Sequence, residues 1–476
     1  MLQAIAGKEF LQMARDGRFR VVTLLMLALL LLSLFAGARH HRSLRTERER
    51  AAQVQRDQWL TQGEKGPHAA AHFGVYAFKP SGSLALVDRG VNAYAGSMIW
   101  LEPHKQNSFR DAPAQDSTSL LRFGELTTAF VLQTALPLLI ITLTFGAFAG
   151  ERERGTLRLA AAQGVRMETL ALGKALGIAG ALGLLLVPAA ICGAATLVLG
   201  GAVTRGSGSD LVPRTLLLAL SYLLYFGITL FLSLAVSAWA RTARLALLFL
   251  LGGWVAATLI APRLVADAAK RLYPTPSSVA FAEKVKFELA GAGDAHNESD
   301  QRMERLKQET LKQYGVQDLK DLPVAFEGIS LQAGEDWGYP VFDRNYNALD
   351  AQFSRQEAVC ETAGYVLPFL SIRSLSAGLS GTDRRAHEHF ARATEVYRRT
   401  LIRIINDDVK YHAKTGDTGY TNGRALYEKV PVFAYKPLTV SDLRDSFRMP
   451  LLALAAGFFT TAAVAVFSAR KQRILP

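Results

Sequence analysis

Histidines and their acidic neighbours are the residues of this sequence whose types could support metal or acid–base chemistry. His387 and His389 flank Glu388, but residues two apart do not share a helix face, so the three do not form a His-Glu-x-x-His zinc site. The pair His40 and His41 is equally unsupported. We therefore predict that this chain binds no metal.

Nucleotide hydrolysis and covalent catalysis find no better support. Gly173-Lys174-Ala175 lacks both the upstream glycine spacing and the hydroxyl of a phosphate-binding loop. No serine or cysteine stands in a recognisable nucleophile motif, and Cys192 and Cys360 give no disulfide framework. We expect a chain that is not an enzyme by itself, binds no cofactor and cannot hydrolyse ATP alone.

The apolar residues of the 476-residue chain gather in long uncharged runs, which is typical of a membrane protein. The net charge of +13 does not indicate nucleic-acid binding, because the basic residues lie beside these runs or among acidic residues. Six runs are long enough to cross a bilayer as helices, the fifth only marginally. We predict these transmembrane helices at residues 21–38, 127–150, 170–200, 215–240, 245–261 and 449–469.

Basic residues in the short connections predict the orientation. They cluster in residues 1–20, 151–169, 241–244 and 470–476, which lie on one side if six spans exist. That side should be the cytoplasm of a bacterial inner membrane, with both termini inside. Five arginines in residues 39–50 oppose this assignment, but acidic residues are interleaved with them. The first apolar run lacks a cleavage site, so we expect it to be retained rather than removed as a signal peptide.

Two long polar segments, residues 39–125 and 263–448, are then expected in the periplasm. The first should begin as a helical extension of the first span, and the second should contain helices at 268–289, 300–314, 345–366 and 383–407. The run from Val75 to Pro80 is nearly repeated from Val432 to Pro437, each as an edge strand would be. We hypothesise that both lie in one small sheet of a single periplasmic domain; a coincidental similarity is the alternative. The predicted fold is thus a mainly α membrane protein, with six transmembrane helices and a mainly helical (α+β) periplasmic domain built from two insertions.

A short charged helix is predicted on the cytoplasmic side between the second and third spans. Thr156 is a natural helix N-cap, and Gly164 can end the helix. The alternative is an ordinary basic loop at the membrane surface. The residues singled out here are Glu151, Arg152, Glu153, Gly155, Thr156, Leu157 and Arg158.

Polar side chains inside the predicted spans have two interpretations. They line a path between subunits, or they form hydrogen bonds between helices of one subunit. The glycines at 173, 177, 180 and 183 indicate close helix packing. The candidate pathway residues are Gln133, Thr134, Ser221, Tyr225, Thr229 and Ser233.

The charged stretch resembles the coupling helix of type-2 ABC exporter permeases, in which an acidic pair precedes Gly-Thr-Leu. Here the match falls on Glu151, Glu153, Gly155, Thr156 and Leu157. Residues 1–20 are similar to the amphipathic elbow helix of such permeases. The resemblance implies a cytoplasmic ABC ATPase dimer that holds the ATP and Mg, and a second permease subunit, identical or homologous.

A more specific resemblance is to the branch of this family that carries a large periplasmic insert of unknown function. Some relatives are associated with maturation of multi-copper enzymes, although no cysteine or methionine cluster here looks like a copper site. Ala377-Gly378 departs slightly from the family pattern. Further matches fall on residues 101–104 and 122–124, and the signature is carried by Pro368, Ser371, Arg373, Ser376, Gly381, Thr382, Asp383, His387, Phe390, Glu395, Tyr397, Arg398 and Asn406.

The expected function is therefore that of a permease subunit, which couples ATP hydrolysis by a separate ATPase to export or extraction of an unknown substrate. A transmitter or scaffold that moves no solute and only rearranges periplasmic partners is the alternative. Polar but uncharged intramembrane residues are compatible with both.

Overall fold

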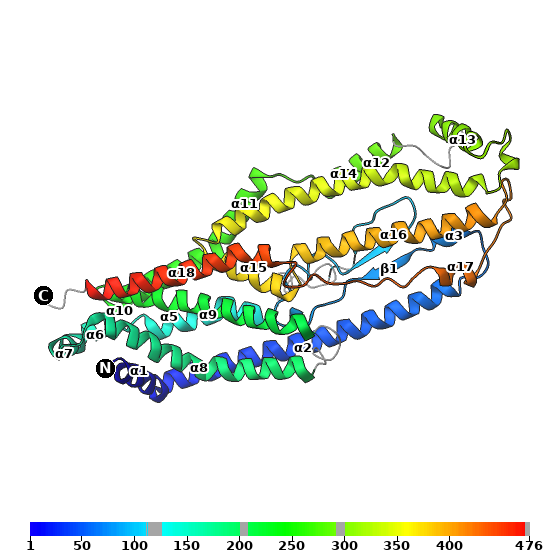
Figure 1. The fold of residues 1–476 in the computed structure, drawn as a ribbon. Coiled ribbons are helices and arrows are strands. Elements are labelled where there is room, and N and C mark those ends of the chain that lie inside the picture. Colours follow the sequence, from blue (N-terminus) through cyan, green and yellow to red (C-terminus); the bar gives the residue numbers. More distant parts are fainter. Residues whose placement is uncertain (111, 113–125, 200–207, 292–299, 472–476) are drawn as a thin grey trace.

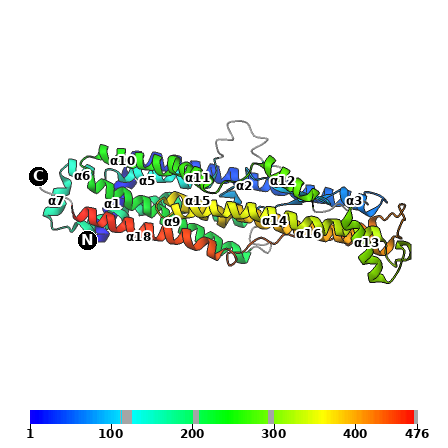
Figure 2. The ribbon, with the colours of Figure 1, turned by 90° about the horizontal axis from the view of Figure 1, so that it is seen from above.

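The computed structural model describes residues 1–110, 112, 126–199, 208–291 and 300–471. The molecule is an elongated bundle whose long helices run roughly along one axis (Figures 1 and 2). The N-terminus and the C-terminal end of the last helix, α18 (Arg444–Arg470), lie at the same end of this bundle as α6 (Ala149–Glu153) and α7 (Thr156–Ala162) (Figure 1). The small sheet and α13 lie toward the opposite end (Figure 1).

Six helices in the described part of the chain are long and apolar enough to cross a membrane, as the sequence predicts. The fifth is not marginal, because its helix continues well past the apolar run. Two of the spans contain a π-helical turn, η3 or η4. The spans are α2 (Gly17–Leu60), the consecutive α4 (Thr128–Phe130), η3 (Val131–Ala135), α5 (Leu136–Thr144) and α6 (Ala149–Glu153), then α8 (Met167–Leu199), α9 (Gly208–Trp239), the continuous α10 (Ala243–Val255), η4 (Ala256–Ile260) and α11 (Ala261–Leu272), and α18 (Arg444–Arg470).

The N-terminal helix α1 (Leu2–Arg15) packs closely on α8. A Cβ at Gly173 would lie 2.6 Å from the Ile5 side chain, and one at Gly177 would lie 2.6 Å from the Ala6 carbonyl oxygen. Only glycine permits this approach, which confirms close packing at two of the four glycines of this span.

Helix α2 is much longer than a bilayer crossing requires. Asp16 caps its N-terminus by accepting a hydrogen bond from the Arg18 backbone N–H. Its 44 residues continue to Leu60, so the predicted helical extension of the first span is confirmed. Near the far end, the buried Trp59 donates from Nε1 to the Tyr427 carbonyl oxygen at 3.1 Å.

The extramembrane domain draws on both insertions. The first insertion supplies a three-stranded antiparallel sheet in the order β1-β2-β3, with Val75 opposite Leu101 and Ile99 opposite Phe109. Long helices α14 and α16 run side by side over it (Figures 1 and 2). Its elements are α3 (Pro67–His72), β1 (Val75–Phe78), η1 (Ser83–Leu86), β2 (Met98–Leu101), β3 (Phe109–Arg110), α12 (Ser278–Ala290), α13 (Gln301–Tyr314), η5 (Leu319–Asp321), α14 (Phe326–Ala363), α15 (Pro368–Ser380), α16 (Arg384–His412) and α17 (Arg424–Lys429).

One hydrophobic core joins the two insertions. Trp59, Ala77 and Ile99 from the first pack with Phe390 and Tyr427 from the second. Burial of these large side chains in a shared core makes the two insertions a single body.

The hypothesis that the two similar runs lie in one small sheet is wrong. Residues 75–78 form β1, but β1 pairs with β2, and residues 432–437 form no strand. Phe433 and Tyr435 instead pack their rings against Phe390, with centroids 5.8 and 5.1 Å away. The repeated aromatic pattern thus reflects packing on one shared core rather than backbone pairing.

The predicted helix boundaries in the second insertion need two main corrections. The helix expected at 268–289 is broken after Leu272, where Pro274 and Pro276 prevent its continuation. The helix expected at 345–366 begins earlier, at Phe326, and passes through Pro340. Helices α13 and α16 begin one residue after Asp300 and Asp383, whose carboxylates cap them, so their predicted starts are right to within one residue.

Candidate coupling loop and domain junction

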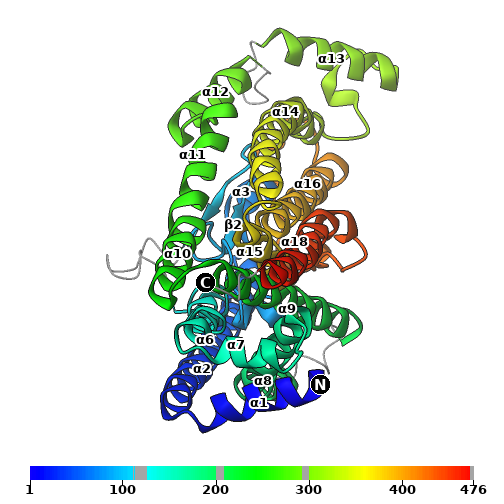
Figure 3. The same cartoon turned by 90° about the vertical axis from the view of Figure 1, so that its left-hand side faces the viewer.

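The 151–169 loop leaves the second span through two short helices at the end of the molecule that carries the N-terminus (Figure 3). Helix α6 ends at Glu153, and α7 spans Thr156–Ala162. Gly155, with φ of +76°, makes the turn between them and occupies the N-cap position that the sequence assigned to Thr156. The Thr156 hydroxyl instead donates to the Glu151 carbonyl oxygen at 3.2 Å.

Glu151 points into the protein rather than away from it. Its Oε1 accepts a hydrogen bond from Lys174 Nζ at 2.8 Å, and the same ammonium lies 2.8 Å from Glu9 Oε1. The Lys174 side chain is only 1% exposed. One buried cation thus ties α1, α6 and α8 together.

Arg152 and Glu153 attach the loop to two further spans. The Arg152 guanidinium donates to the carbonyl oxygens of Ala238 and Ala240 at the C-terminal end of α9. Glu153 Oε1 accepts from the Ala243 backbone N–H at 3.1 Å, at the N-terminus of α10. Each charge complements the helix dipole that it meets.

Apart from the exposed Glu153, the outward surface of the loop is formed by residues that make none of these contacts. Leu157 is buried in the hydrophobic core of the bundle, whereas Leu159 is 65% exposed. Arg154, Arg158 and Gln163 are also exposed. The acidic pair therefore fixes the orientation of α7, which presents a basic and partly apolar face.

At its other end, α9 is joined to the extramembrane domain by Arg214. The guanidinium donates to the carbonyl oxygen of Leu379 at 2.9 Å, at the C-terminal end of α15, and to that of Leu438 at 2.5 Å. Asp210 binds the Arg214 Nε at 2.5 Å and accepts from the Val440 backbone N–H at 2.8 Å. This ion pair connects three segments that are far apart in the sequence.

A second polar connection runs beside it. Gln133 in the second span donates to the hydroxyl of Tyr222 at 3.1 Å, and this hydroxyl lies 2.9 Å from Ser376 Oγ. The Gln133 amide also reaches Asp88 Oδ2 at 3.5 Å. Burial raises the pKa of the Asp88 carboxyl, opposed by hydrogen bonds from Ser376 and Gly90.

Two family models match the sequence. A model described as ABC-2 family transporter protein covers residues 3–310, and one described as a domain of unknown function (DUF3526) covers residues 279–436. The first spans more than half of the chain. The chain belongs to the ABC-2 transporter family. It is accordingly a membrane permease of an ABC transporter with an additional C-terminal helical domain, and this family implies an ATPase partner. No curated protein and no solved structure gave a significant match.

The permease turns most of its candidate pathway side chains inward. Gln133, Ser221, Tyr225 and Ser233 are buried within the single chain. Tyr225 donates to the Gln133 carbonyl oxygen at 3.0 Å. Ser221 and Thr229 donate to carbonyl oxygens one turn earlier in α9, and Thr134 is half-buried.

The C-terminal signature forms the corner between α15 and α16. Pro368 is the first residue of α15, the Ser371 hydroxyl donates to the Gly364 carbonyl oxygen, and Gly381 ends α15 with φ of +68°. The Thr382 hydroxyl donates a hydrogen bond to the Asp88 carbonyl oxygen at 3.1 Å. The Asp383 carboxylate caps α16 by accepting from the Ala386 backbone N–H. Residues 122–124 of the sequence match lie outside the described residues. Of the remaining signature residues, Arg373 is exposed, Phe390 is in the core, Tyr397 donates to the Pro431 carbonyl oxygen, and Asn406 donates to Gln332.

Arg398 is the charged centre of the extramembrane domain. Its guanidinium binds both oxygens of Glu395 at 2.8 Å and reaches Glu335 Oε2 at 3.2 Å, with the side chains of Arg398 and Glu335 each 1% exposed. Burial would raise the pKa of Glu335, but the hydrogen bond from His104 and the charge of Arg398 lower it to about 2. Two carboxylates and one guanidinium thus form a buried ionic group.

His387 meets a buried lysine from the first insertion. Lys79 Nζ lies 2.7 Å from His387 Nδ1, while His387 Nε2 lies 3.0 Å from the Gly96 carbonyl oxygen. Because a carbonyl can only accept, Nε2 carries the proton and Nδ1 accepts from the lysine. Burial, followed by the charge of Lys79, lowers the pKa of His387 to about 4, and burial lowers the pKa of Lys79 to about 7.

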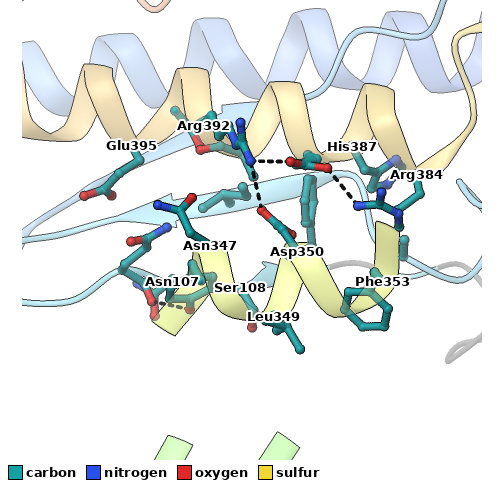
Figure 4. A pocket seen from close by; sticks show the side chains of 18 of the residues that line it. Asn107, Ser108, Asn347, Leu349, Asp350, Phe353, Arg384, His387, Arg392 and Glu395 are labelled. Atoms are coloured by element: carbon teal, nitrogen blue, oxygen red, sulfur yellow. Dashed lines mark hydrogen bonds and ion pairs between the residues drawn. The ribbon is translucent and has the colours of Figure 1, made fainter. Parts of the chain in front are cut away.

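A cavity of about 820 Å³ lies between α14, α16 and the sheet (Figure 4). The Arg392 guanidinium lies 3.6 Å from the Asp350 carboxylate, and Glu388 pairs with both Arg384 and Arg392 (Figure 4). Ile99 and Phe353 contribute apolar surface. The cavity is large enough for a small-molecule ligand or for a side-chain cluster of another protein.

Several residues that organise the permease were missed from the sequence. Lys174 was considered only as part of a failed nucleotide motif, although a lysine inside a span is itself a functional signal. Arg214 is a weaker indication of function in the sequence, because it lies close to the start of α9 rather than in the middle of a span. A group formed by His68, His72 and His104 was also missed; its detectable feature is the four-residue spacing of the first two histidines.

Proposed function

We propose that this permease couples ATP hydrolysis by a separate dimeric ABC ATPase to export or extraction of a substrate. In this proposal the termini and the 151–169 loop face the cytoplasm of a bacterial inner membrane, and the extramembrane domain is periplasmic. The basic residues near both termini and in the loop support this orientation. A second permease subunit, identical or homologous, would complete the membrane pathway.

The attachment of the 151–169 loop to several spans, through the residues of α6 that precede α7, is the observation that carries the proposal. Glu151 joins the loop to α1 and α8 through Lys174, Arg152 joins it to α9, and Glu153 joins it to α10. A force applied to α7 therefore reaches four helices through charged contacts. This is what rigid-body gating by an ATPase would require.

The exposed face of α7 is the proposed ATPase contact. Arg158 and Leu159 lie on it, whereas Glu151 is bound inside the permease by Lys174, and Glu153, although exposed, is bound to the Ala243 backbone N–H. We therefore assign Glu151 and Glu153 a positioning role and Arg158 and Leu159 a docking role.

Co-purification tests this assignment. The permease, in detergent, is combined with the ABC ATPase encoded nearest its gene, and the double variant Arg158→Glu plus Leu159→Asp is compared with Arg305→Glu. Arg305 is an exposed arginine on α13, at the opposite end of the molecule. Wild type and Arg305→Glu should retain the ATPase and stimulate its turnover, whereas the α7 variant should release it. Equal retention by the α7 variant would refute the docking assignment.

Mechanical transmission without solute transport is the second candidate. It is favoured by the inward orientation of Gln133, Ser221 and Tyr225, which hydrogen-bond within one chain rather than facing a path between subunits. In that case the domain cavity would engage a periplasmic partner instead of a transported substrate. Reconstituted vesicles separate the two candidates, because a transmitter retains stimulated ATPase activity while no candidate substrate accumulates.

A further inference from the structure

Three histidines of the first insertion converge on one point of the extramembrane domain. His68 and His72 lie one helical turn apart on α3, and His104 lies in the turn that follows β2. The Nε2 atom of His68 is 3.1 Å from that of His72 and 3.4 Å from that of His104. One ring nitrogen from each residue lies within 4.8 Å of the others.

These separations suit a shared metal ion. Imidazole nitrogens bind Zn²⁺ at about 2.0–2.1 Å, so two nitrogens at tetrahedral positions are roughly 3.4 Å apart. Imidazole nitrogens are common ligands of Zn²⁺, Cu²⁺ and Ni²⁺. The spacing therefore favours one ion held by three nitrogens.

The ring of His104 is held in the orientation of a metal ligand. Its Nδ1 lies 2.9 Å from Glu335 Oε1, and its backbone N–H donates to the same oxygen at 2.6 Å. Because the carboxylate accepts from Nδ1–H, the neutral ring keeps the lone pair on Nε2 and directs it toward His68. A carboxylate on the second nitrogen is the usual support of a metal-binding histidine.

The backbone at His104 supports the same conclusion. Its φ of +61° is the only positive φ at a non-glycine residue in the described part of the chain. A conformation of this kind persists only where the surroundings hold it, and here Glu335 binds both the backbone and the ring. Glu335 in turn belongs to the buried group centred on Arg398.

We propose that His68, His72 and His104 form a binding site for a divalent late transition-metal ion such as Zn²⁺, with Glu335 positioning His104. Imidazole donors suit this class of ion, and three protein ligands leave a fourth position for water or an exchangeable ligand. His72 is exposed and the other two histidines are half-buried, so the ion can enter from solvent. Bound metal would fasten α3 to the turn after β2 and, through Glu335, to α14.

Metal binding to the full-length, tag-free permease in detergent tests the proposal. The protein is stripped with a chelator and titrated with Zn²⁺ alone, and bound metal is measured by calorimetry and elemental analysis. Substitution by Co²⁺ gives an independent readout, because a tetrahedral site has a characteristic visible absorption. Wild type should bind one ion per chain, and His72→Gln should bind at least about 10-fold more weakly because it loses a ligand.

His412→Gln is the matched control, since His412 is a partly exposed histidine of the same domain that lies outside the cluster. It should bind as wild type does. Glu335→Gln keeps a hydrogen-bond acceptor and should weaken binding by about 10–100-fold. The site does not exist if wild type binds no stoichiometric ion, or if His72→Gln binds like wild type. His72 is at the surface, so its replacement should not prevent folding, and retained ATPase binding would report an intact permease.

Discussion

Arg214, near the start of α9, donates to the carbonyl oxygen of Leu379 at the last turn of α15, 2.9 Å away. The opposite end of α9 is held by Arg152, which donates to the carbonyl oxygens of Ala238 and Ala240. A single continuous helix thus connects the loop that carries α7 with the corner where the extramembrane domain begins. Because α9 is a continuous helix, a displacement of its Arg152 end along the helix axis would also displace its Arg214 end.

Replacing Arg214 with methionine should destabilise the junction. The change removes a largely buried cation, so Asp210 loses its ion-pair partner and the carbonyl oxygens of Gly378, Leu379 and Leu438 lose this donor. Breaking such a pair typically lowers the free energy of unfolding by about 3–5 kcal/mol. The measurement is the thermal unfolding midpoint in detergent, with the exposed Arg244→Met as control. Identical midpoints for the two variants would mean that the junction contributes nothing.

Replacing Lys174 with methionine should be more harmful than removing the whole ionic group. The single change leaves the carboxylates of Glu9 and Glu151 close together, with only the exposed Lys8 ammonium, 3.8 and 3.7 Å away, to offset their repulsion. The triple variant that adds Glu9→Gln and Glu151→Gln removes this repulsion, so it should recover most of the lost stability. Folded yield and thermal midpoint are the readouts. A triple variant as unstable as Lys174→Met would contradict this explanation.

Acidification should destabilise the extramembrane domain through His387. Burial and the charge of Lys79 lower its pKa from 6.5 to about 4, against weaker raising effects of Gly96 and Asp383 and a further lowering by Arg48. Between these two values the unfolded chain binds more protons than the folded chain, so the free energy of unfolding falls as pH falls from 6.5 to 4. The measurement is the free energy of unfolding at several pH values between 6.5 and 4, which should decrease toward pH 4. In His387→Gln this free energy should depend less on pH over the same range.

The same reasoning gives a separate alkaline effect for Lys79. Burial lowers its pKa from 10.5 to about 7, so the folded chain releases a proton that the unfolded chain keeps. The free energy of unfolding should rise with pH between about 7 and 10.5. Lys79→Met should remove this rise, and an unchanged slope in that variant would assign the effect to another group.

Gly90→Ala should weaken contact between the first insertion and the signature corner. Gly90 has φ of +47°, and a Cβ there would lie 2.3 Å from the Thr382 carbonyl oxygen. The new side chain is strained by the backbone angle and collides with a backbone atom, so we expect a loss of at least about 1–2 kcal/mol in the free energy of unfolding. Gly63→Ala is an informative comparison, because Gly63 also has positive φ but has open space around it. The measurement is the thermal unfolding midpoint of each variant in detergent. Equal midpoints for Gly90→Ala and Gly63→Ala would show that the contact with Thr382 does not contribute to stability.

The sequence predicts the features that depend on neighbours along the chain. The six spans follow from local hydropathy, and the starts of α13 and α16 follow from the capping carboxylates of Asp300 and Asp383. The long continuation of α14 was hidden because Gly338 and Pro340 usually interrupt helices.

The arrangement of the sites depends on residues that meet only after folding. Glu151 turns inward because Lys174 lies beneath it, and His104 reaches α3 because a turn after β2 returns the chain there. The two similar aromatic runs likewise meet one core without pairing with each other. The local sequence pattern predicts which residue types each site contains. It does not predict the tertiary partners that orient their side chains.

The 44 residues of α2 form one uninterrupted helix of about 66 Å, roughly twice the thickness of the hydrocarbon layer. Its outer end is fastened to the C-terminal part of the extramembrane domain, where Arg56 and Trp59 bind the carbonyl oxygens of Val430 and Tyr427. In a helix of this length, a small tilt at the inner end produces a large displacement of the outer end. A tilt of about 10° around its inner end would sweep its outer end through roughly 11 Å, so a small rearrangement near α1 becomes a large displacement far from the membrane.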